Sequence, residues 1–236
     1  MAARSDGVLF DVDGTLIDTT YLHTVAWWEA LRQFDHAVPM ALIHRSIGMG
    51  SDRLLDHLLG PERDRASDDR LRAAHDTLFL GYADRLTPLP HAADLLRACA
   101  ERGLRVVLAT SAAEHEVRAL RAALDADDVV DTVTSSADAQ QGKPAPDILV
   151  AALEQSGLAA ERVVFVGDSV WDVAAAGRLG IPCIGLTCGG TGRAELAGAG
   201  AVEVYDDPGA LLASLADSPV LGRRHDHTDA DMNVKA

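Results

Sequence analysis

The sequence predicts an α/β protein with a doubly wound, Rossmann-like parallel sheet that is interrupted by an inserted helical domain. From residue 87 onward, short apolar runs alternate with amphipathic segments, as in βαβ units. One strand-like run precedes this series and is separated from it by a block with helical periodicity alone. We therefore expect a core from 1–18 and 87–216, a helical cap from 19–86, and a disordered tail from 217–236.

The first strand carries two carboxylates at its end. Val8–Phe10 is apolar and too short for a helix, and Asp11 and Asp13 follow it. In an extended chain these two side chains lie on one face, and Gly14 then allows a sharp turn. Open α/β sheets place their ligands at the carboxyl ends of strands, although a solvated acidic turn is the favoured explanation for this pair taken alone.

The inserted block reads as a series of helices. Two of them carry apolar stripes at helical spacing: Leu22, Val25, Ala26, Trp28 or Trp27, and Leu31 in the first, and Leu71, Ala74, Leu78 and Tyr82 in the last. The helices are expected at 19–34, 39–44, 52–59 and 67–85, with a turn at 48–51.

The second part of the core alternates regularly. Glycines at three helix ends, Gly103, Gly157 and Gly180, are typical stop signals. Strands are expected at 104–109, 129–133, 162–166, 182–186 and 201–205, and helices at 91–102, 113–124, 146–156, 170–179 and 193–198. The glycine-rich loop 188–192 lacks the Lys-Ser/Thr of a phosphate-binding loop and is interpreted as a turn.

Composition restricts the partners. The 236 residues carry a formal net charge of −15, which disfavours a nucleic-acid partner. Three scattered cysteines fit a reducing compartment. Neither a signal sequence nor an apolar run of about 18 residues is present, so we expect a cytoplasmic protein without membrane contact, as a monomer or homodimer.

Further polar residues follow the later strands. Thr110 and Ser111 come after 104–109, and Ser111 with Glu114 has the spacing of a helix-capping box. Ser169 and Asp172 have the same spacing after 162–166, but Asp168 is an additional carboxylate that capping does not require.

Parallel strands bring these side chains to one edge, together with Lys143 from a loop. Asp11, Asp13 and Asp168 would then repel one another by about 4 kcal/mol per pair at ~4 Å. One lysine does not offset this repulsion, whereas a divalent cation does, and an oxygen-rich site suits Mg²⁺. Carboxylates, a cation, a lysine and a hydroxyl at a helix N-terminus favour phosphoryl transfer.

The four segments resemble the four motifs of the haloacid dehalogenase superfamily. They are Asp11-Val-Asp13-Gly-Thr, Thr110, Lys143-Pro-Ala-Pro-Asp and Gly167-Asp168-Ser-Val-Trp-Asp172, and the resemblance covers 7–207 in order and spacing. A helical insertion directly after the first motif is similar to the mobile cap of the subgroup that contains phosphoglycolate phosphatase and β-phosphoglucomutase.

The resemblance implies roles for the strand-end residues. Asp11 would be the nucleophile that forms an aspartyl-phosphate, and Asp13 the general acid and base. Neighbouring negative charge should raise the pKa of Asp13 so that it holds a proton. Mg²⁺ would be bound by Asp11, by the Asp13 backbone carbonyl and by Asp168, with Asp172 as a support or a further ligand.

The phosphoryl group would be bound by Thr110, Ser111 and Lys143. The expected substrate is a small phosphorylated metabolite of unspecified identity. In the cap, His23, Arg45, Met49 and Ser51 are candidate substrate contacts, since the turn 48–51 can enter the core site when the cap closes.

The sequence separates the family's reactions in part. Dehalogenases and phosphonate-cleaving members lack the second aspartate, and the latter also use a cap lysine, which 19–86 does not contain. A Mg²⁺-dependent phosphatase is the first hypothesis. A phosphomutase of the β-phosphoglucomutase type remains open, because Thr19 and His23 resemble its hinge, although the turn 48–51 lacks its phosphate-binding arginine. A catalytically silent metal-binding regulatory domain is the third.

Overall fold

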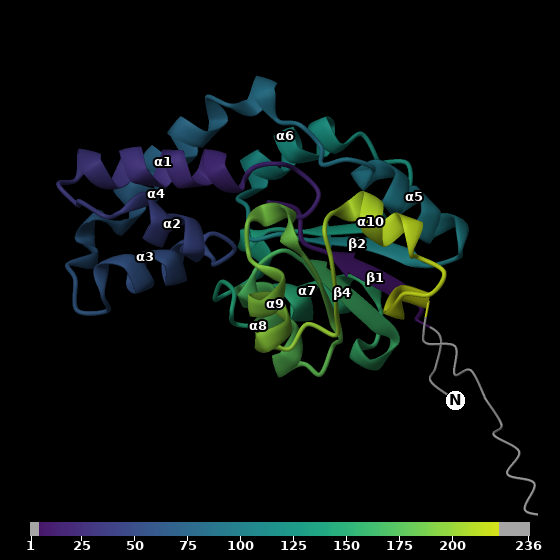
Figure 1. Ribbon diagram of the computed structural model, residues 1–236. Coiled ribbons are helices and arrows are strands. Elements are labelled where there is room, and N and C mark those ends of the chain that lie inside the picture. The colour runs from purple at the N-terminus through teal and green to yellow at the C-terminus, as the bar shows by residue number, and fades with distance from the viewer. Residues whose placement is uncertain (1–4, 222–236) are drawn as a thin grey trace, which may run out of the picture.

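A computed structural model describes residues 5–221 of the chain. Its centre is a six-stranded, all-parallel sheet in the order β3-β2-β1-β4-β5-β6, so the first strand in the chain lies in the middle (Figure 1). The predicted doubly wound parallel sheet is confirmed. The strands are β1 Gly7–Phe10, β2 Arg105–Ala109, β3 Thr132–Thr134, β4 Val163–Gly167, β5 Cys183–Leu186 and β6 Glu203–Tyr205.

Helices cover both faces of the sheet, because side chains alternate along each strand. In β1, Val8 and Phe10 pack into one apolar core and Leu9 into the other. The first core also contains α5 (Ala92–Glu101), α6 (Glu114–Leu124) and α10 (Pro208–Ala213), and the second contains α7 (Asp147–Ser156), α8 (Val170–Arg178) and α9 (Arg193–Ala199).

Four of the five α-helices between β1 and β2, α1 to α4, form a separate group, seen at the left of Figure 1. They have their own apolar core, in which Trp27 and Leu31 meet Ile43 and Leu71. A third core, distinct from the two that flank the sheet, supports our treatment of this segment as its own unit. The helices are α1 Thr20–Gln33, α2 Met40–Ser46, α3 Ser51–Leu59 and α4 Asp68–Leu80.

The expected apolar stripes of α1 and α4 were partly wrong. In α1 the buried tryptophan is Trp27, whereas Trp28 is partly exposed, and His23 is buried on the same face. In α4 the buried positions include Leu71, His75 and Phe79, at spacings of four residues. Both faces include polar residues that hydrophobic periodicity does not register, so the stripe was placed one position away.

Several boundaries also differ from expectation. Helix α6 begins at Glu114, and Glu116, not Glu114, accepts the amide of the capping residue Ala113 at 2.9 Å. The capping box proposed for Ser111 is therefore wrong. Helix α10 was not expected at all. The chain continues into a turn at Pro219–Leu221 with Val220 buried, and the rest of the expected tail, 222–236, lies outside the described residues.

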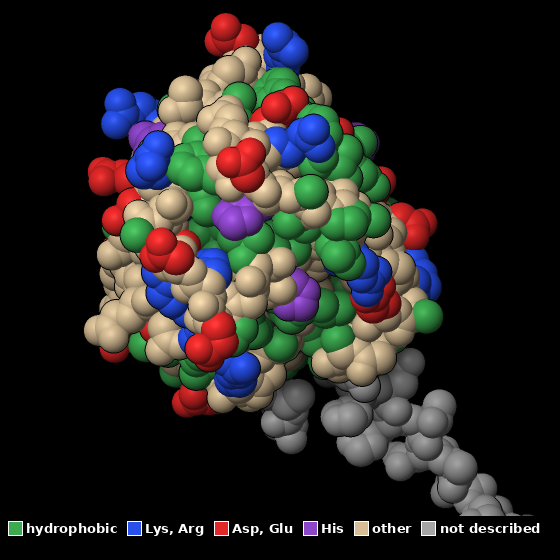
Figure 2. All heavy atoms as spheres, turned by 90° about the vertical axis from the view of Figure 1, so that its left-hand side faces the viewer, with side chains coloured by type: hydrophobic (Ala, Val, Ile, Leu, Met, Phe, Trp, Pro, Cys, Tyr) green, Lys and Arg blue, Asp and Glu red, His purple; other side chains and the backbone are tan. Residues whose placement is uncertain are grey.

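The outer face of the α1–α4 group is mixed in character. Figure 2, which looks onto this side, shows acidic and basic side chains interspersed with apolar side chains and histidines. No large area of a single charge is visible on this face despite the net charge of −15. Among residues 5–221, no helix combines the length and the apolar character that crossing a membrane requires.

Candidate active site

The candidate site lies where the strand order reverses. Strand β1 pairs with β2 on one side and β4 on the other, and Phe10 is opposite both Leu108 and Val166. The chain leaves these three strands at one edge, the position at which doubly wound sheets bind ligands. Asp11, Thr110 and Asp168 therefore lie close together although they are far apart in the sequence.

Lys143 is buried between two carboxylates. Its Nζ lies 2.5 Å from Asp11 Oδ1 and 2.7 Å from Asp172 Oδ1, and its side chain has no exposed surface. Asp172 is fixed in turn, because its Oδ2 accepts hydrogen bonds from the Ser169 amide at 3.0 Å and hydroxyl at 2.6 Å. The expected cap at Ser169 is confirmed. Asp172 thus places Lys143 against Asp11.

Three carboxylates crowd this point. Asp11, Asp168 and Asp172 are all buried, and each offers an oxygen within 4.8 Å of the others. Burial raises the pKa of Asp11 to about 7, with further contributions from Asp172 and Asp13 that Lys143 opposes. Burial, followed by Asp172 and Asp11, raises the pKa of Asp168 well above its usual value. The mutual repulsion of the three carboxylates and the all-oxygen donor set both fit a hard divalent cation.

Two glycines allow Asp168 to occupy its position. A Cβ on Gly189 would lie 1.6 Å from Asp168 Oδ2, and one on Gly14, whose φ is +77°, would lie 2.7 Å from the same atom. Thr15 donates a hydrogen bond to Asp168 Oδ1 at 2.9 Å. The sequence analysis treated the loop 188–192 as a plain turn and missed its role as the wall behind Asp168. The local sequence carries no signal for such a contact.

Asp13 is bound to His23, which comes from α1. His23 Nε2 lies 3.1 Å from Asp13 Oδ1, and Thr19 donates to the same oxygen at 2.8 Å. Burial alone would raise the pKa of Asp13, but the charge and hydrogen bond of His23, with the hydroxyls of Thr19 and Thr110, lower it below its usual value. The expectation that negative neighbours raise this pKa is wrong, because the nearest partner is an imidazole.

The contact with Asp13 also shifts the pKa of His23. Burial by itself would lower the pKa of His23, yet Asp13 outweighs that effect and raises it. The proton of the Asp13–His23 pair is therefore held on the histidine side.

The two residues after β2 have different surroundings. Thr110 is buried, and its hydroxyl donates to Asp13 Oδ2 at 3.3 Å and accepts the Ala112 amide at 3.0 Å. It supports Asp13 instead of lining the pocket. Ser111 does line the pocket, and its buried hydroxyl oxygen has no hydrogen-bond partner among the described residues.

A pocket of about 210 Å³ lies in front of Asp11 and Asp13. Its other walls come from the α1–α4 group and α6, and they include His23, Met49 and Ser51 as expected. Trp27, Arg72 and His75 also line it and were not singled out from the sequence. Arg72 is the one Arg or Lys lining this pocket in the part of the chain that the structure describes.

Arg45 lies elsewhere. Its side chain is 61% exposed and forms an ion pair with Glu195 of α9, and both residues line a second pocket that Asp168 also lines. Trp171 donates its indole N–H to the Arg45 carbonyl at 3.0 Å. The expected substrate contact through Arg45 is thus replaced by a contact between the helical group and the sheet domain.

The turn before α3 touches the loop of Lys143. A Cβ on Gly50 would lie 2.4 Å from the Cα of Gly142, and one on Gly142 would lie 2.3 Å from the Cα of Gly50. Asp52 also accepts the Gly142 amide at 3.3 Å. The helical group is therefore closed over the site, with backbone against backbone at this point.

Comparisons with known proteins agree with this geometry. A family model for haloacid dehalogenase-like hydrolases matches residues 6–180. A phosphoglycolate phosphatase from Rhodospirillum rubrum is 35% identical over 220 residues, covering 89% of each chain, and one from Escherichia coli K12 is 33% identical over 207 residues, covering 78% of this chain and 81% of that protein.

A solved structure of a hydrolase from Pseudomonas syringae superimposes with a TM-score of 0.85 at 32% identity, covering 89% of this chain and 98% of that one. This match covers most of the chain's length. The chain is therefore an enzyme that belongs to the haloacid dehalogenase-like hydrolases, the family that its sequence motifs resemble.

Proposed function

We propose that the protein is a Mg²⁺-dependent phosphatase that hydrolyses a small phosphate ester through an aspartyl-phosphate on Asp11. The observation that carries this proposal is the placement of the Asp11 carboxylate at the floor of the pocket, 2.5 Å from the buried Lys143 ammonium and beside Asp13. The phosphatase names of the curated relatives support it.

The residues divide the reaction into two steps. A carboxylate oxygen of Asp11 attacks phosphorus, and the bond from phosphorus to the ester oxygen breaks. The leaving oxygen takes a proton from Asp13, which is supplied in turn by His23 across their 3.1 Å contact. Water then attacks the phosphoryl group, loses its proton to the Asp13–His23 pair, and releases phosphate and the Asp11 carboxylate.

Lys143 and a cation held by the carboxylates would serve one electrostatic purpose. Asp11 must be ionised to attack, yet burial without metal raises its pKa to about 7. Lys143 lowers that pKa and neutralises charge on the phosphoryl oxygens. Asp11, Asp168 and the Asp13 carbonyl would hold Mg²⁺, which supplies further positive charge at the phosphoryl group.

We further propose that the substrate carries a second anionic group, as phosphoglycolate does. The pocket of about 210 Å³ suits a small molecule, and Arg72 of α4, which is paired with Asp69 at 2.8 Å, is among its lining residues. His23, whose pKa is raised, adds positive charge on the same wall. A substrate whose carboxylate binds at Arg72 would have its phosphate group next to Asp11.

The experiment is a substrate panel with Mg²⁺, measured as phosphate release. We expect phosphoglycolate to be hydrolysed with a lower KM than ethyl phosphate, which lacks the carboxylate. Arg72→Gln should raise KM for phosphoglycolate by about 10- to 100-fold, the value of one charge-assisted hydrogen bond, and leave KM for ethyl phosphate nearly unchanged. Arg70→Gln, on the same helix but outside the pocket lining, is the matched control.

Two results would contradict the proposal at different levels. Hydrolysis that persists in Asp11→Asn or in excess chelator would refute the mechanism. Equal effects of Arg72→Gln on both esters would refute the assignment of the second anionic group and leave the mechanism standing.

A phosphomutase is the second candidate, because Thr19 and His23, which resemble positions of the mutase hinge, both contact Asp13. A mutase must bind a second phosphate in the cap, and Arg45 lies outside this pocket. Isomerisation of a sugar phosphate that depends on a bisphosphate primer and exceeds hydrolysis would favour this candidate.

A further inference from the structure

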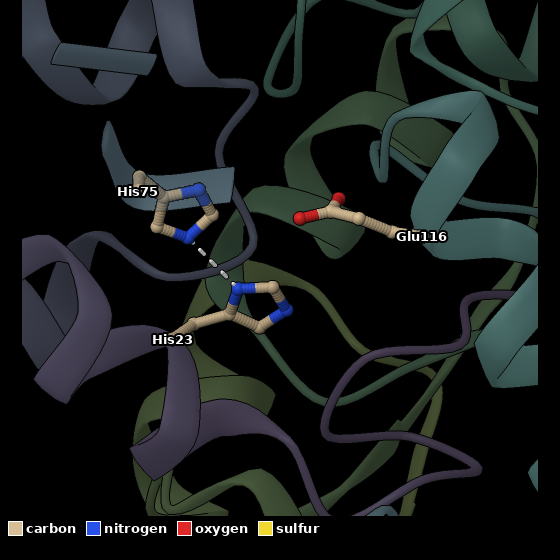
Figure 3. A group of neighbouring side chains, drawn as sticks. All are labelled: His23, His75 and Glu116. Atoms are coloured by element: carbon tan, nitrogen blue, oxygen red, sulfur yellow. Dashed lines mark hydrogen bonds between the residues drawn. The ribbon is translucent and has the colours of Figure 1, made fainter. Parts of the chain in front are cut away.

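A group of three buried side chains lies between the helical group and the sheet domain, on the wall of the same pocket as Asp11 but without any residue of the Asp11, Asp168 and Asp172 group. His23 comes from α1, His75 from α4 and Glu116 from α6 (Figure 3). Each offers one nitrogen or oxygen within 4.8 Å of the others. Figure 3 shows the Glu116 carboxylate directed toward the space beside the two imidazoles.

The hydrogen bonds of the two imidazoles leave one ring nitrogen of each histidine facing the other. His23 Nε2 contacts Asp13 Oδ1 at 3.1 Å, and His75 Nδ1 contacts Asp76 Oδ1 at 3.0 Å. An ionised carboxylate only accepts, so each of these ring nitrogens must be the N–H donor. The remaining nitrogens, His23 Nδ1 and His75 Nε2, lie 3.1 Å apart, so a protonated His23 donates to His75, whereas a neutral His23 leaves on each nitrogen a lone pair that can bind a metal ion.

Glu116 adds an unused oxygen at the same place. Its Oε2 accepts the Ala113 amide at the start of α6, whereas its Oε1 is buried without a hydrogen-bond partner among the described residues. The residue as a whole is 3% exposed. A buried carboxylate oxygen left without a partner is costly, so this atom requires an explanation.

We propose that this group is a second metal site, which binds a transition-metal ion such as Zn²⁺ through His23 Nδ1, His75 Nε2 and Glu116 Oε1. Two imidazoles and a carboxylate suit zinc and not magnesium, which prefers oxygen alone. Two nitrogens at zinc–nitrogen distances of about 2.0–2.1 Å lie roughly 2.9–3.4 Å apart for angles between a right angle and a tetrahedral one, and the observed 3.1 Å falls within this range.

The surroundings are those of a metal-binding histidine pair. Metal-bound histidines donate their other ring N–H to a carboxylate, and both histidines here do so. Trp27 and Phe79 stack on the rings, with centroids 4.2 Å from His75 and 3.8 Å from His23 respectively, and they fix the ring planes.

An ion at this site would link two parts of the molecule. Its ligands come from α1 and α4 on one side and from α6 on the other, so it would hold the helical group against the sheet domain. Through His23 it would also act on Asp13. Zn²⁺ binding should therefore inhibit turnover, because opening for substrate entry would be restrained.

The test is a zinc titration of the full chain with millimolar Mg²⁺ present, using a chromophoric chelator as competitor. We expect one tightly bound Zn²⁺ per chain, a rise in Tm, and a Co²⁺ derivative with visible ligand-field absorption. His75→Gln and Glu116→Gln should each weaken zinc binding at least about tenfold. Glu116→Gln retains an oxygen for the Ala113 amide, so it provides a fold-preserving variant should His75→Gln be unstable.

Three control variants separate this site from others. Asp168→Asn alters the carboxylate group, His115→Gln alters a neighbouring group that shares Glu116, and a double His225→Gln/His227→Gln variant removes two further histidines. All three should keep the zinc. Loss of zinc in any of them, unchanged affinity in both His75→Gln and Glu116→Gln, or the absence of stoichiometric binding by the unaltered chain would overturn the proposal.

Discussion

Replacing Lys143 by methionine should destabilise the metal-free protein strongly. The ammonium lies 2.5 Å from Asp11 and 2.7 Å from Asp172, and at an effective dielectric near 20 each attraction amounts to about 6 kcal/mol. Burying the ammonium offsets much of this attraction. Removal of one partner from a buried pair leaves the carboxylates unpaired, so we expect the free energy of unfolding to fall by about 3–5 kcal/mol.

The assay is urea denaturation in chelator, followed by tryptophan fluorescence. Added Mg²⁺ should stabilise Lys143→Met more than the unaltered protein, because the ion then provides the only positive charge beside the carboxylates. Arg121→Met removes the same charge from an exposed ion pair with Asp127 and should change stability little. A loss for Lys143→Met no larger than for Arg121→Met would refute the reasoning, since the carboxylates would then need no ammonium.

Three further outcomes are expected. In chelator, the folded state holds the Asp11 proton more tightly than the unfolded chain, since burial raises the pKa of Asp11 from 3.8 to about 7. The free energy of unfolding should therefore fall between about pH 4 and pH 7, and it should fall less in Asp11→Asn. Equal slopes of the unfolding free energy against pH in the two proteins, measured by urea denaturation, would contradict this. Gly189→Ala should abolish Mg²⁺-dependent activity by displacing Asp168, whereas Gly177→Ala, in open space on α8, should not. Full activity of Gly189→Ala in a phosphate-release assay would be inconsistent with the contact between Gly189 and Asp168. Arg45→Ala should leave KM for phosphoglycolate unchanged, and a rise of about tenfold would place this arginine in the substrate pocket after all.

The sheet could be predicted because the signals for its strands and for the flanking helix ends lie in short stretches of the sequence. Runs such as Val163–Val166 are apolar on both faces, and glycine stops such as Gly157 and Gly180 mark the helix ends. The carboxylates Asp11 and Asp168 follow strands directly, so the topology alone brings them together. Helix α10 escaped prediction because its boundaries depend on packing. The extent of α6 was predicted, but its cap was not, because the capping glutamate is Glu116, two residues beyond the Glu114 that the Ser111 spacing indicated.

The wall opposite the carboxylates could not be predicted in the same way. Arg72 and His75 reach the pocket only because α4 packs across α1, and no spacing in the sequence encodes that crossing. The pKa of Asp13 was misjudged for the same reason: the sequence shows acidic neighbours, whereas the nearest group in space is His23. Residues that act across an interface between two units are those for which the three-dimensional structure is required.

The contact between Gly50 and Gly142 limits how such an enzyme can diversify. Under the proposed function, side chains of the helical insertion that line the pocket select the substrate, so exchange of that insertion between relatives is an obvious way to seek new specificities. Here the insertion rests backbone to backbone on the residue preceding Lys143. A transplanted insertion with a side chain at that turn would push on the lysine loop, so it would need both glycines, or a longer turn, to leave the chemistry intact.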